Sequence, residues 1–580
     1  MMMMIKAAPS KALVVRINLV FFGFFLIFYA TLLFTNFPSI VLNCPPKTED
    51  GLHRTAALGE LRGDGSTAER RRAAAVKREK PSFLNEIGGS GMKIGMVNME
   101  DEDVGEWNLD GETITVRYEK VSENLEWKRL FPEWIDEEEE TAAGKPSCPE
   151  IPMPEMADYP YMDLIVAKLP CNGTSAAAAG GWGRDVFRLQ IHLIAANLAV
   201  ARGRRDWYKK TKVLLLSKCR PMVELFRCKE LKKQENDWWY FEADIIKLSQ
   251  KVSLPIGSCN LALPLWGKGM NKVYDVSNIE NTAMVAAKRE AYATVLHSSQ
   301  AYVCGAITLA QSLLRTGTKR DLILLLDSTI PETKREALAK AGWKLRFIKR
   351  IRNPRAEKKS YNEYNYSKLR LWQLTDYDKV IFVDSDVIVL RNIDVLFHFP
   401  EISAAGNDGS IFNSGVMVLE PSNCTFGLFM RRANDIVSYN GGDQGFLNEI
   451  FVWWHRLPRR VNFLKNFWSN SSAETTLKNR LFGSDPPELY AIHYLGMKPW
   501  LCYRDYDCNW DISHQRVYAS DVAHRTWWKV HDAMDEKLQR FCGLSDWRKI
   551  RLEKERKTAR KMGFPDQHWR INVTDPRRFN

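Results

Sequence analysis

The sequence lacks the signatures of several common functional classes. It contains no C-x-x-C pair, so a structural zinc site is not expected. The cluster Gly180-Gly181-Trp182-Gly183 lacks the glycine spacing of a dinucleotide fingerprint and is typical of a turn. No compact basic arm or RNA-binding signature accompanies the net charge of +13, because basic and acidic residues interleave over most of the chain. We therefore expect no nucleic-acid partner. Nucleotide phosphates, acidic polysaccharides or an anionic membrane surface fit the charge better.

What is present indicates a folded protein of more than one domain. The chain has 580 residues, and a prior of about 150 residues per domain allows two to four. Hydrophobic residues make up 45% and charged residues 26%, which permits a sizeable core. The 11 cysteines are an odd number. Cys502 and Cys508 are close enough in sequence to pair in an oxidising compartment, although pairing cannot be deduced from sequence.

An apolar run near the N-terminus predicts a single membrane anchor over residues 17–37. Its strongly apolar part, 17–34, has about the minimum length for crossing a bilayer, and no clear cleavage site of small residues follows it. Basic residues precede the run, so the positive-inside rule predicts a cytosolic N-terminus and a lumenal remainder. This type II topology predicts that a secretory chain carries glycans at some of its N-x-S/T sequons, such as those that begin at Asn172, Asn423, Asn470 and Asn572.

The remaining organisation follows from shifts in composition. Proline and charged runs after the anchor indicate a solvated stem, in which the alternating segment 113–116 is the best candidate for a local strand. Apolar strand patterns flank a helical pattern over 185–201 in the next segment, which predicts an accessory α/β segment. The expected parts are a cytosolic tail (1–16), the anchor (17–37), a lumenal stem (38–147), the accessory segment (148–286), a catalytic domain (287–510) and a C-terminal extension (511–580) without an assigned role.

Strand and helix patterns alternate from residue 288 onward. Expected strands at 292–296, 322–326, 345–348 and 380–383 are separated by helices at 301–315, 331–341 and 367–374. This alternation predicts an α/β fold with a Rossmann-like, mostly parallel sheet, whose ligands bind beyond the carboxyl ends of the strands.

Two aspartates lie at one such strand end. Asp384 and Asp386 follow the apolar segment 380–383, and residues two apart in an extended chain point to the same side. They are therefore candidate ligands of one hard cation. A distant His493 is a candidate third ligand, and an imidazole among oxygen ligands favours Mn²⁺ over Mg²⁺. Lys498, five residues later, is a candidate contact for the phosphates of a nucleotide.

Two polar, glycine-containing segments complete the set. Asn413, Ser414 and Gly415 precede an apolar strand pattern, as close approach of a ligand requires. The segment 440–445 offers a carboxylate and an amide at the start of a helix. Taken separately, each segment is equally consistent with a simple turn or a helix cap. Lys368 is a second candidate phosphate contact, or a solvated helix lysine.

The ordered set D-S-D, F-N-S-G, G-G-D-Q-G and H-x-x-G-x-K-P-W resembles glycosyltransferase family 8, the family of glycogenin, over about residues 289–500. The resemblance implies a GT-A fold, a UDP-sugar donor, Mn²⁺ and retention of anomeric configuration. The metal ligands would be Asp384, Asp386 and His493, with Tyr302 stacked on uracil. The expected catalytic residues are Asp443, Gln444 and Lys368. The expected donor-binding residues are Tyr302, Asn413, Ser414, Gly415, Asn440, Gly441, Gly442, Asp443, Gln444, His493, Tyr494, Leu495, Gly496, Met497 and Lys498.

Within the family, an anchor, a stem and a long N-terminal extension resemble the plant members that add glucuronate to xylan in the Golgi. This implies a UDP-glucuronate donor, a xylan acceptor and a Golgi membrane location. Asn440 stands where glycogenin has an aspartate, so recognition of the donor sugar is expected to differ. Arg370 and Arg504 are possible partners of a glucuronate carboxylate. The alternatives are a transferase using UDP-glucose, UDP-galactose or UDP-galacturonate, and a non-catalytic Golgi scaffold.

Overall fold

The computed structural model describes most of the chain from residue 81 onward. The described residues are 81–87, 91–100, 111–131, 149–171, 181–259, 289–297, 300–407, 410–468, 471–575 and 577. They belong to one compact unit that begins at Lys77. The expected tail and anchor, residues 1–37, lie outside the described residues. Within the described ranges, no helix combines the length and the apolar character that crossing a bilayer requires.

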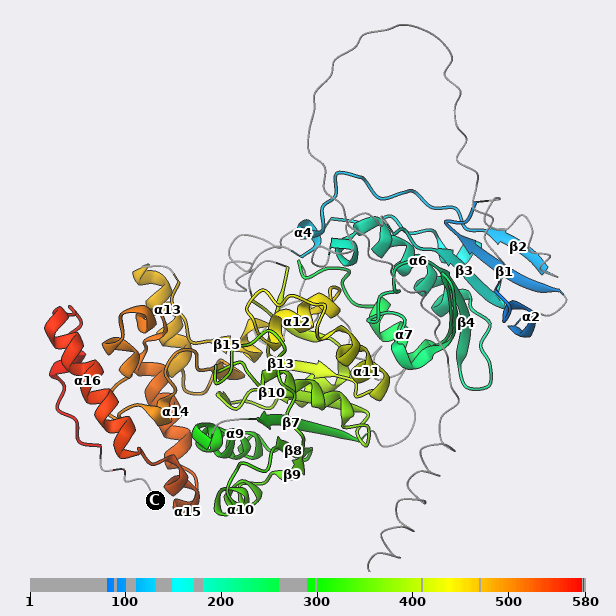
Figure 1. Cartoon of the computed structure of the whole chain (residues 1–580). Helices are drawn as coiled ribbons and strands as arrows, with labels where there is room; N and C mark the ends of the chain where they lie inside the picture. The colour runs from blue at the N-terminus through cyan, green and yellow to red at the C-terminus, as the bar shows by residue number, and fades with distance from the viewer. Residues whose placement is uncertain are drawn as a thin grey trace, which may run out of the picture. The chain divides into compact units, whose positions relative to one another are not determined.

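A seven-stranded sheet with the order β14-β12-β13-β10-β7-β8-β9 forms the centre of the C-terminal half (Figure 1). β10, β7, β8 and β9 run parallel to one another, whereas β13 is antiparallel to both of its neighbours. The expected α/β fold with a mostly parallel sheet is confirmed. The strands are β7 (Glu290–Leu296), β8 (Asp321–Leu326), β9 (Lys344–Phe347), β10 (Lys379–Val383), β12 (Ser403–Gly406), β13 (Phe412–Leu419) and β14 (His455–Leu457).

The central strands of this sheet are buried on both faces, which explains their nearly continuous apolar sequences. In β7, Ala291 and Ala293 face one core, and Tyr292 and Leu296 face the other. Helix α9 (Val303–Arg315) belongs to the second core, together with α10 (Glu332–Lys340). The segment expected to be a helix at 367–374 is instead a 3₁₀ helix over Asn365–Gln373.

A six-stranded sheet with the order β2-β1-β3-β4-β6-β5 precedes the seven-stranded one. β1 and β2 come from the segment expected to be a stem (38–147), and they pair in parallel beside β3. The local strand expected at 113–116 largely coincides with β2, whereas the stem prediction is wrong for β1, whose charged surroundings in the sequence resemble a solvated stem. The strands are β1 (Met92–Val97), β2 (Gly111–Thr115), β3 (Leu164–Lys168), β4 (Lys210–Leu216), β5 (Leu231–Glu235) and β6 (Trp238–Asp244).

The two sheets share one hydrophobic core. Helices α6 (Val186–Arg202) and α7 (Ile245–Val252) cover the six-stranded sheet, and residues of both helices join a buried cluster that includes Ala291 and Trp454. A buried ion pair between Arg227 and Glu420 at 2.9 Å and the Cys228–Cys424 disulfide also cross this boundary. The accessory segment is thus packed against the catalytic sheet.

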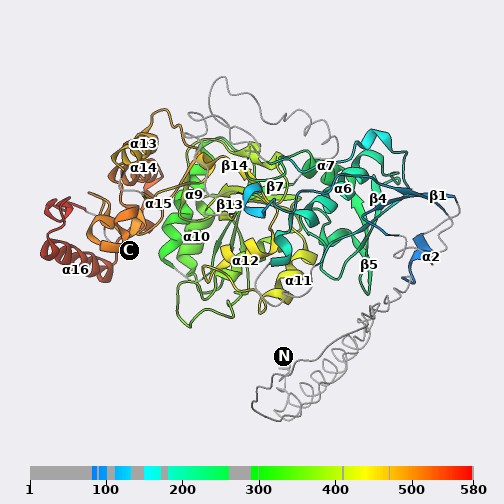
Figure 2. The same ribbon diagram turned by 90° about the horizontal axis from the view of Figure 1, so that it is seen from above.

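A small three-stranded sheet and the C-terminal helices, which are labelled α13 to α16 in Figure 2, complete the described fold. Its strands are β11 (Val387–Val389), β16 (Ala491–His493) and β15 (Phe463–Leu464), in that order. Helix α14 packs on α13 and α9, and the Cys304–Cys542 disulfide links α9 to the C-terminal extension. The other helices are α2 (Leu84–Ile87), α4 (Trp127–Leu130), α11 (Asn423–Arg432), α12 (Asp443–Ile450), α13 (Ser472–Gly483), α14 (Asp521–Asp532), α15 (Glu536–Gln539) and α16 (Asp546–Met562).

Candidate active site

Two aspartates and a histidine meet at the junction of the seven-stranded and three-stranded sheets. Asp384 and Asp386 follow β10, and His493 is the last residue of β16. β11 and β16 pair antiparallel with Val387 opposite His493, which brings the imidazole beside Asp386. One ligand atom from each of the three residues lies within 4.8 Å of the other two. Two carboxylates and an imidazole form a donor set that suits a divalent cation such as Mn²⁺.

The orientation of His493 is fixed by a side chain that the sequence did not point to. The Nδ1 atom lies 3.0 Å from Asn462 Oδ1, and Asn462 Nδ2 donates to Asn413 Oδ1 at 2.8 Å. The carboxamide oxygen of Asn462 can only accept, so Nδ1 is the donor in this contact, and in the neutral imidazole Nε2 is then the unprotonated nitrogen. Nε2 faces Asp386 at 3.4 Å from its Oδ1. An imidazole held in this tautomer is ready to bind a metal through Nε2.

Gly415 of the F-N-S-G segment gives the imidazole its space. A Cβ atom at this position would lie 2.5 Å from Cε1 of His493, which is closer than atoms can pack. The sequence predicted a close approach here, but it assigned that approach to a ligand. In the structure the approaching group is the ring of His493.

Two lysines form ion pairs with the carboxylates of the site. Lys498 Nζ lies 2.6 Å from Asp386 Oδ2 and also donates to the Tyr494 carbonyl. Lys368 Nζ lies 2.6 Å from Asp443 Oδ2 and 3.4 Å from Asp384 Oδ1. Lys368 is therefore a buried partner of two acids and not a solvated helix lysine. The two cations stand on either side of the Asp384–Asp386 pair.

Burial and ion pairing shift the pKa values of these groups in opposite directions. Burial lowers the pKa of Lys368, but Asp384 and Asp443 raise it to about 12. Burial also lowers the pKa of Lys498, and Asp386 overcomes this effect and raises it. Burial raises the pKa of Asp386, yet the ammonium of Lys498 holds it well below its usual range. Burial raises the pKa of Asp384 to about 6. Both ammonium groups therefore remain charged at neutral pH.

Asp443 and Gln444 are the first two residues of helix α12, and both accept hydrogen bonds from the F-N-S-G segment. Asp443 Oδ2 accepts a hydrogen bond from Ser414 Oγ at 3.1 Å, and Gln444 Oε1 accepts one from the Ser414 backbone N–H at 3.1 Å. The Oδ1 atom of Asn440 accepts from the backbone N–H groups of Gly442 and Gly445. An aspartate could make the same two contacts, so the departure from glycogenin at Asn440 preserves the loop.

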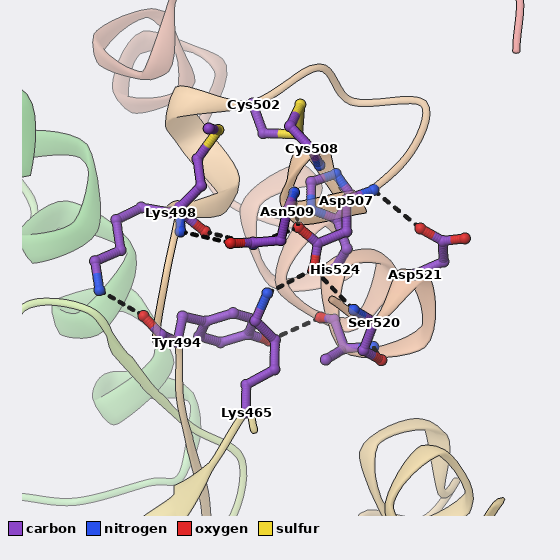
Figure 3. A network of polar contacts seen from close by, with 12 residues as sticks. Lys465, Tyr494, Lys498, Cys502, Asp507, Cys508, Asn509, Ser520, Asp521 and His524 are labelled. Atoms are coloured by element: carbon purple, nitrogen blue, oxygen red, sulfur yellow. Dashed lines mark hydrogen bonds and ion pairs between the residues drawn. A yellow bond between two sulfur atoms is a disulfide. The ribbon is translucent and has the colours of Figure 1, made fainter. Parts of the chain in front are cut away.

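The loop from Tyr494 to Lys498 is held by Asn509, from the segment that follows it (Figure 3). Asn509 accepts a hydrogen bond from the Met497 N–H at 2.8 Å and donates to the Met497 carbonyl at 3.2 Å. Gly496 has φ +71°, and a Cβ atom there would lie 2.4 Å from Asn509 Oδ1. Only glycine fits this turn.

The side chains of this loop do not all face the metal ligands. The Tyr494 hydroxyl donates to the Ala523 carbonyl on α14, and Met497 packs in a separate cluster with the Cys502–Cys508 region. A donor contact from either residue would therefore use its backbone. The Cys502–Cys508 disulfide considered from the sequence is present in the structure.

A cavity of about 610 Å³ opens beside the metal ligands, within the size range of small-ligand sites. The predicted residues that line it are Tyr302, Lys368, Asp384, Asp386 and Asp443. The other predicted residues do not line the cavity; among them, Asn413, Ser414, Gly415 and His493 lie behind the wall formed by the carboxylates. The site is thus assembled from strand ends far apart in the sequence.

The cavity also contains residues that sequence reasoning missed. His297 and Arg350 lie in segments that follow β7 and β9, and Tyr361 and Tyr364 belong to the loop before the 3₁₀ helix. No periodicity or motif marks them, because each lies in irregular chain. Burial lowers the pKa of His297 to about 4, so its imidazole is neutral.

The two arginines that the sequence offered as partners of a sugar carboxylate do not line this cavity. Arg370 donates to Gln373 and to the Lys349 carbonyl, and Arg504 pairs with Asp532 in the C-terminal extension. Sequence alone could not place either guanidinium, and this expectation is corrected.

Comparison with known proteins agrees with the site. The family model described as GUX1-5 N-terminal domain matches residues 72–259, and the model described as Glycosyl transferase family 8 matches residues 293–405. In Arabidopsis thaliana, UDP-glucuronate:xylan alpha-glucuronosyltransferase 2 is 57% identical over 597 residues, which span 100% of this chain and 98% of the relative. UDP-glucuronate:xylan alpha-glucuronosyltransferase 1 is 49% identical and covers 84% of this chain and 72% of its own length. Glycogenin-2 of Homo sapiens is 32% identical over 39% of this chain and 46% of the relative.

The chain therefore belongs to glycosyltransferase family 8. Its full-length match places it among the UDP-glucuronate:xylan alpha-glucuronosyltransferases of that family.

Proposed function

We propose that this chain is a retaining, Mn²⁺-dependent glycosyltransferase with a GT-A catalytic domain, which moves glucuronate from UDP-glucuronate to the xylan backbone. The observation that carries the proposal is the Asp384, Asp386 and His493 group with Lys498 paired to Asp386, in which the two aspartates line a ligand-sized cavity. A scaffold protein has no need of a clamp for a diphosphate. Donor and acceptor follow from the relative that is 57% identical over the whole chain and carries both in its name.

In this proposal the metal ligands are Asp384, Asp386 and His493. A bound Mn²⁺ supplies Lewis-acid neutralisation of the charge on a departing diphosphate. Lys498 contributes a second positive charge at the same place, and Tyr302 offers its ring to uracil. The main contribution of these side chains is electrostatic stabilisation by groups that are already positioned.

Asp443, Gln444 and Lys368 are proposed to surround the donor sugar. Ser414 holds Asp443 and Gln444 at the start of α12, and the ion pair with Asp443 positions Lys368 of the 3₁₀ helix before any ligand arrives. We assign retention to front-face attack, in which the acceptor hydroxyl approaches beside the leaving phosphate oxygen and passes its proton to that oxygen. The protein then acts chiefly by holding donor and acceptor at the distance and orientation that the transfer requires.

We further propose a single-pass type II location in the Golgi membrane with the catalytic part in the lumen. The disulfides Cys171–Cys219, Cys228–Cys424, Cys304–Cys542 and Cys502–Cys508 support an oxidising compartment. The parts assigned to residues 1–16, 17–37 and 511–580 remain in the proposal, with a stem that ends before β1.

The test is a transfer assay with the full-length chain in detergent, Mn²⁺, xylo-oligosaccharides and a panel of UDP-sugars. A truncation at residue 148 is unsuitable, because it would remove β1 and β2 from the six-stranded sheet. Products are read by mass and linkage. Glucuronate added to xylose units, with other donors at least about tenfold slower, supports the proposal.

Transfer of glucose, galactose or galacturonate instead would discard the glucuronate assignment and keep the metal site. No transfer and no release of UDP from any donor would favour the scaffold. Protease protection of the C-terminal part in sealed microsomes tests the lumenal location separately.

A further inference from the structure

The cavity has two chemically different ends. Tyr302 lies within the electrostatic influence of Lys498, Asp386 and Asp384, which form the metal end. At the other end, Asn353 Nδ2 and Asn362 Nδ2, from the loop that follows Arg350, donate to the Gly441 carbonyl two residues before Asp443, and His297 and Arg350 line the cavity. Lys368 joins the two ends, since it pairs with both Asp384 and Asp443. In the proposed function Asp443 lies beside the donor sugar, so the end that contains Arg350 is the sugar end.

Arg350 is held in a defined orientation at this end. Its Nε lies 2.7 Å from Oδ2 of Asp327, a buried residue that directly follows β8. Its guanidinium carbon lies 4.1 Å from the centre of the Tyr364 ring, and both side chains line the cavity. The ion pair fixes one edge of the guanidinium, and the ring fixes its plane.

This geometry leaves a donor edge suited to a carboxylate. A guanidinium carries five N–H donors, and its two terminal nitrogens match a carboxylate in bidentate fashion. Among the described residues, Asp327 is the carboxylate paired with Arg350. About 29% of the Arg350 side chain is exposed, so an anion in the cavity can reach it while much of its surface is shielded from water.

The other cations that line the cavity fit this role less well. Lys368 is already bound by two carboxylates. Lys359 lies on the exposed rim and has no aromatic ring holding its side chain in the described structure. His297 is neutral because burial lowers its pKa to about 4.

We propose that Arg350 binds the C6 carboxylate of the donor sugar and so selects a uronate over the neutral hexose. The assignment rests on the proposed function, since it takes Asp443 to mark the sugar end. Arg350 then acts as a specificity residue: it contributes to the affinity for UDP-glucuronate and contributes little to the affinity for UDP-glucose or UDP.

The test compares equilibrium binding of UDP-glucuronate, UDP-glucose and UDP to the full-length chain by calorimetry, with Mn²⁺ present. Arg350→Gln is expected to weaken UDP-glucuronate binding by about 10- to 100-fold, the usual effect of losing a hydrogen-bonded charge pair. Affinities for UDP-glucose and UDP are expected to change less than about threefold. The affinity of Arg350→Lys for UDP-glucuronate is expected to lie between those of wild type and Arg350→Gln. Lysine keeps the positive charge but loses the two parallel N–H donors of the guanidinium.

Lys359→Gln is the matched control, since it removes a cation from the same cavity. It is expected to leave unchanged the ratio of the affinities for UDP-glucuronate and UDP-glucose, here called the donor ratio. Equal loss of all three ligands in Arg350→Gln would overturn the proposal and leave Arg350 a structural partner of Asp327. A changed donor ratio in Lys359→Gln alone would also overturn it.

Two further precautions separate the possible failures. If Arg350→Gln does not fold, Arg350→Lys keeps a cation beside Asp327, and its donor ratio decides. If the wild-type chain itself binds UDP-glucuronate no better than UDP-glucose and transfers no glucuronate, the proposed function fails and Arg350 loses its role with it. If the wild-type chain prefers UDP-glucuronate and Arg350→Gln loses affinity for all three ligands equally, the Arg350 assignment alone is overturned.

Discussion

The ammonium of Lys465 lies 2.5 Å from Asp507 Oδ2, and neither side chain is more than 1% exposed (Figure 3). Asp507 Oδ1 also accepts a hydrogen bond from Asn509 Nδ2 at 2.6 Å. Asn509 in turn holds both backbone polar groups of Met497, next to Lys498. A buried ion pair within the catalytic domain thus supports the loop that carries a proposed phosphate contact.

Asp507→Asn is expected to lower the free energy of unfolding by about 3–5 kcal/mol, because it leaves the Lys465 ammonium buried without a counter-charge. Chemical denaturation measures this difference. Asp546→Asn, on the exposed first turn of α16, is the control and is expected to cost less than about 1 kcal/mol. A loss of that small size in Asp507→Asn would show that the pair contributes little.

Asp384→Ala and Asp386→Ala are each expected to reduce Mn²⁺-dependent transfer by at least about 100-fold, because a two-carboxylate clamp loses half of its charge. Asp384→Ala should fold normally, since Lys368 keeps Asp443 as a partner. Turnover against Mn²⁺ concentration, with circular dichroism as the folding check, measures the effect. Near-normal activity in either folded variant would remove the metal-site assignment.

Asn462→Ala is expected to weaken Mn²⁺ binding by about 10- to 100-fold, because His493 loses the acceptor that fixes its tautomer. Asn462→Asp keeps that acceptor and loses the donor to Asn413, so metal affinity should recover in this variant. Metal titration followed by electron paramagnetic resonance distinguishes the two. Equal loss in both variants would assign the effect to packing around Asn413.

Lys498→Ala is expected to raise the KM for the UDP-sugar by about tenfold or more, because a buried positive charge next to Asp386 disappears. Lys537→Ala, at an exposed position on α15, is the control. Initial rates over a range of donor concentrations give the comparison. An unchanged donor response would leave Lys498 as a structural partner of Asp386.

His524 is expected to make folding sensitive to acid. Burial lowers its pKa to about 4, so the folded chain holds it neutral, with the Trp528 indole N–H and the Tyr503 carbonyl each 2.9 Å from its Nε2. The unfolded chain protonates near pH 6.5, so stability is full above that value and is lost as pH falls towards about 4. The loss amounts to roughly 3 kcal/mol over this range.

The check is the slope of Tm between pH 4.5 and 6.5. In His524→Gln the slope should be shallower than in wild type, because glutamine can accept from Trp528 without a proton to gain. His514→Gln, at an exposed histidine, is the matched control and should keep the wild-type slope. Identical slopes in His524→Gln and wild type would mean that another group controls the acid response.

The sequence predicted the parts of the fold that local patterns encode. β10 contains a four-residue apolar run, 380–383, that Asp384 directly follows, and a buried strand followed by carboxylates places them at the edge of a sheet. The same reasoning missed β1, because its charged surroundings resemble a solvated stem. The buried part of β1 is only four residues long, 94–97, which is too short to identify a strand from its sequence pattern alone.

The residues of the candidate site also divide into those that the local sequence indicated and those that only the tertiary structure brought together. The sequence determined by itself which residue types were available: the two aspartates, His493, Lys498 and the glycine turns, because their chemistry and spacing are local properties. Only the tertiary structure decided that Asn462 orients His493, that Asp507 supports the loop of Lys498, and that Arg350 lies in the cavity while Arg370 does not. These contacts join segments far apart in the chain, and their partners are selected by packing, which leaves no periodic trace in the sequence.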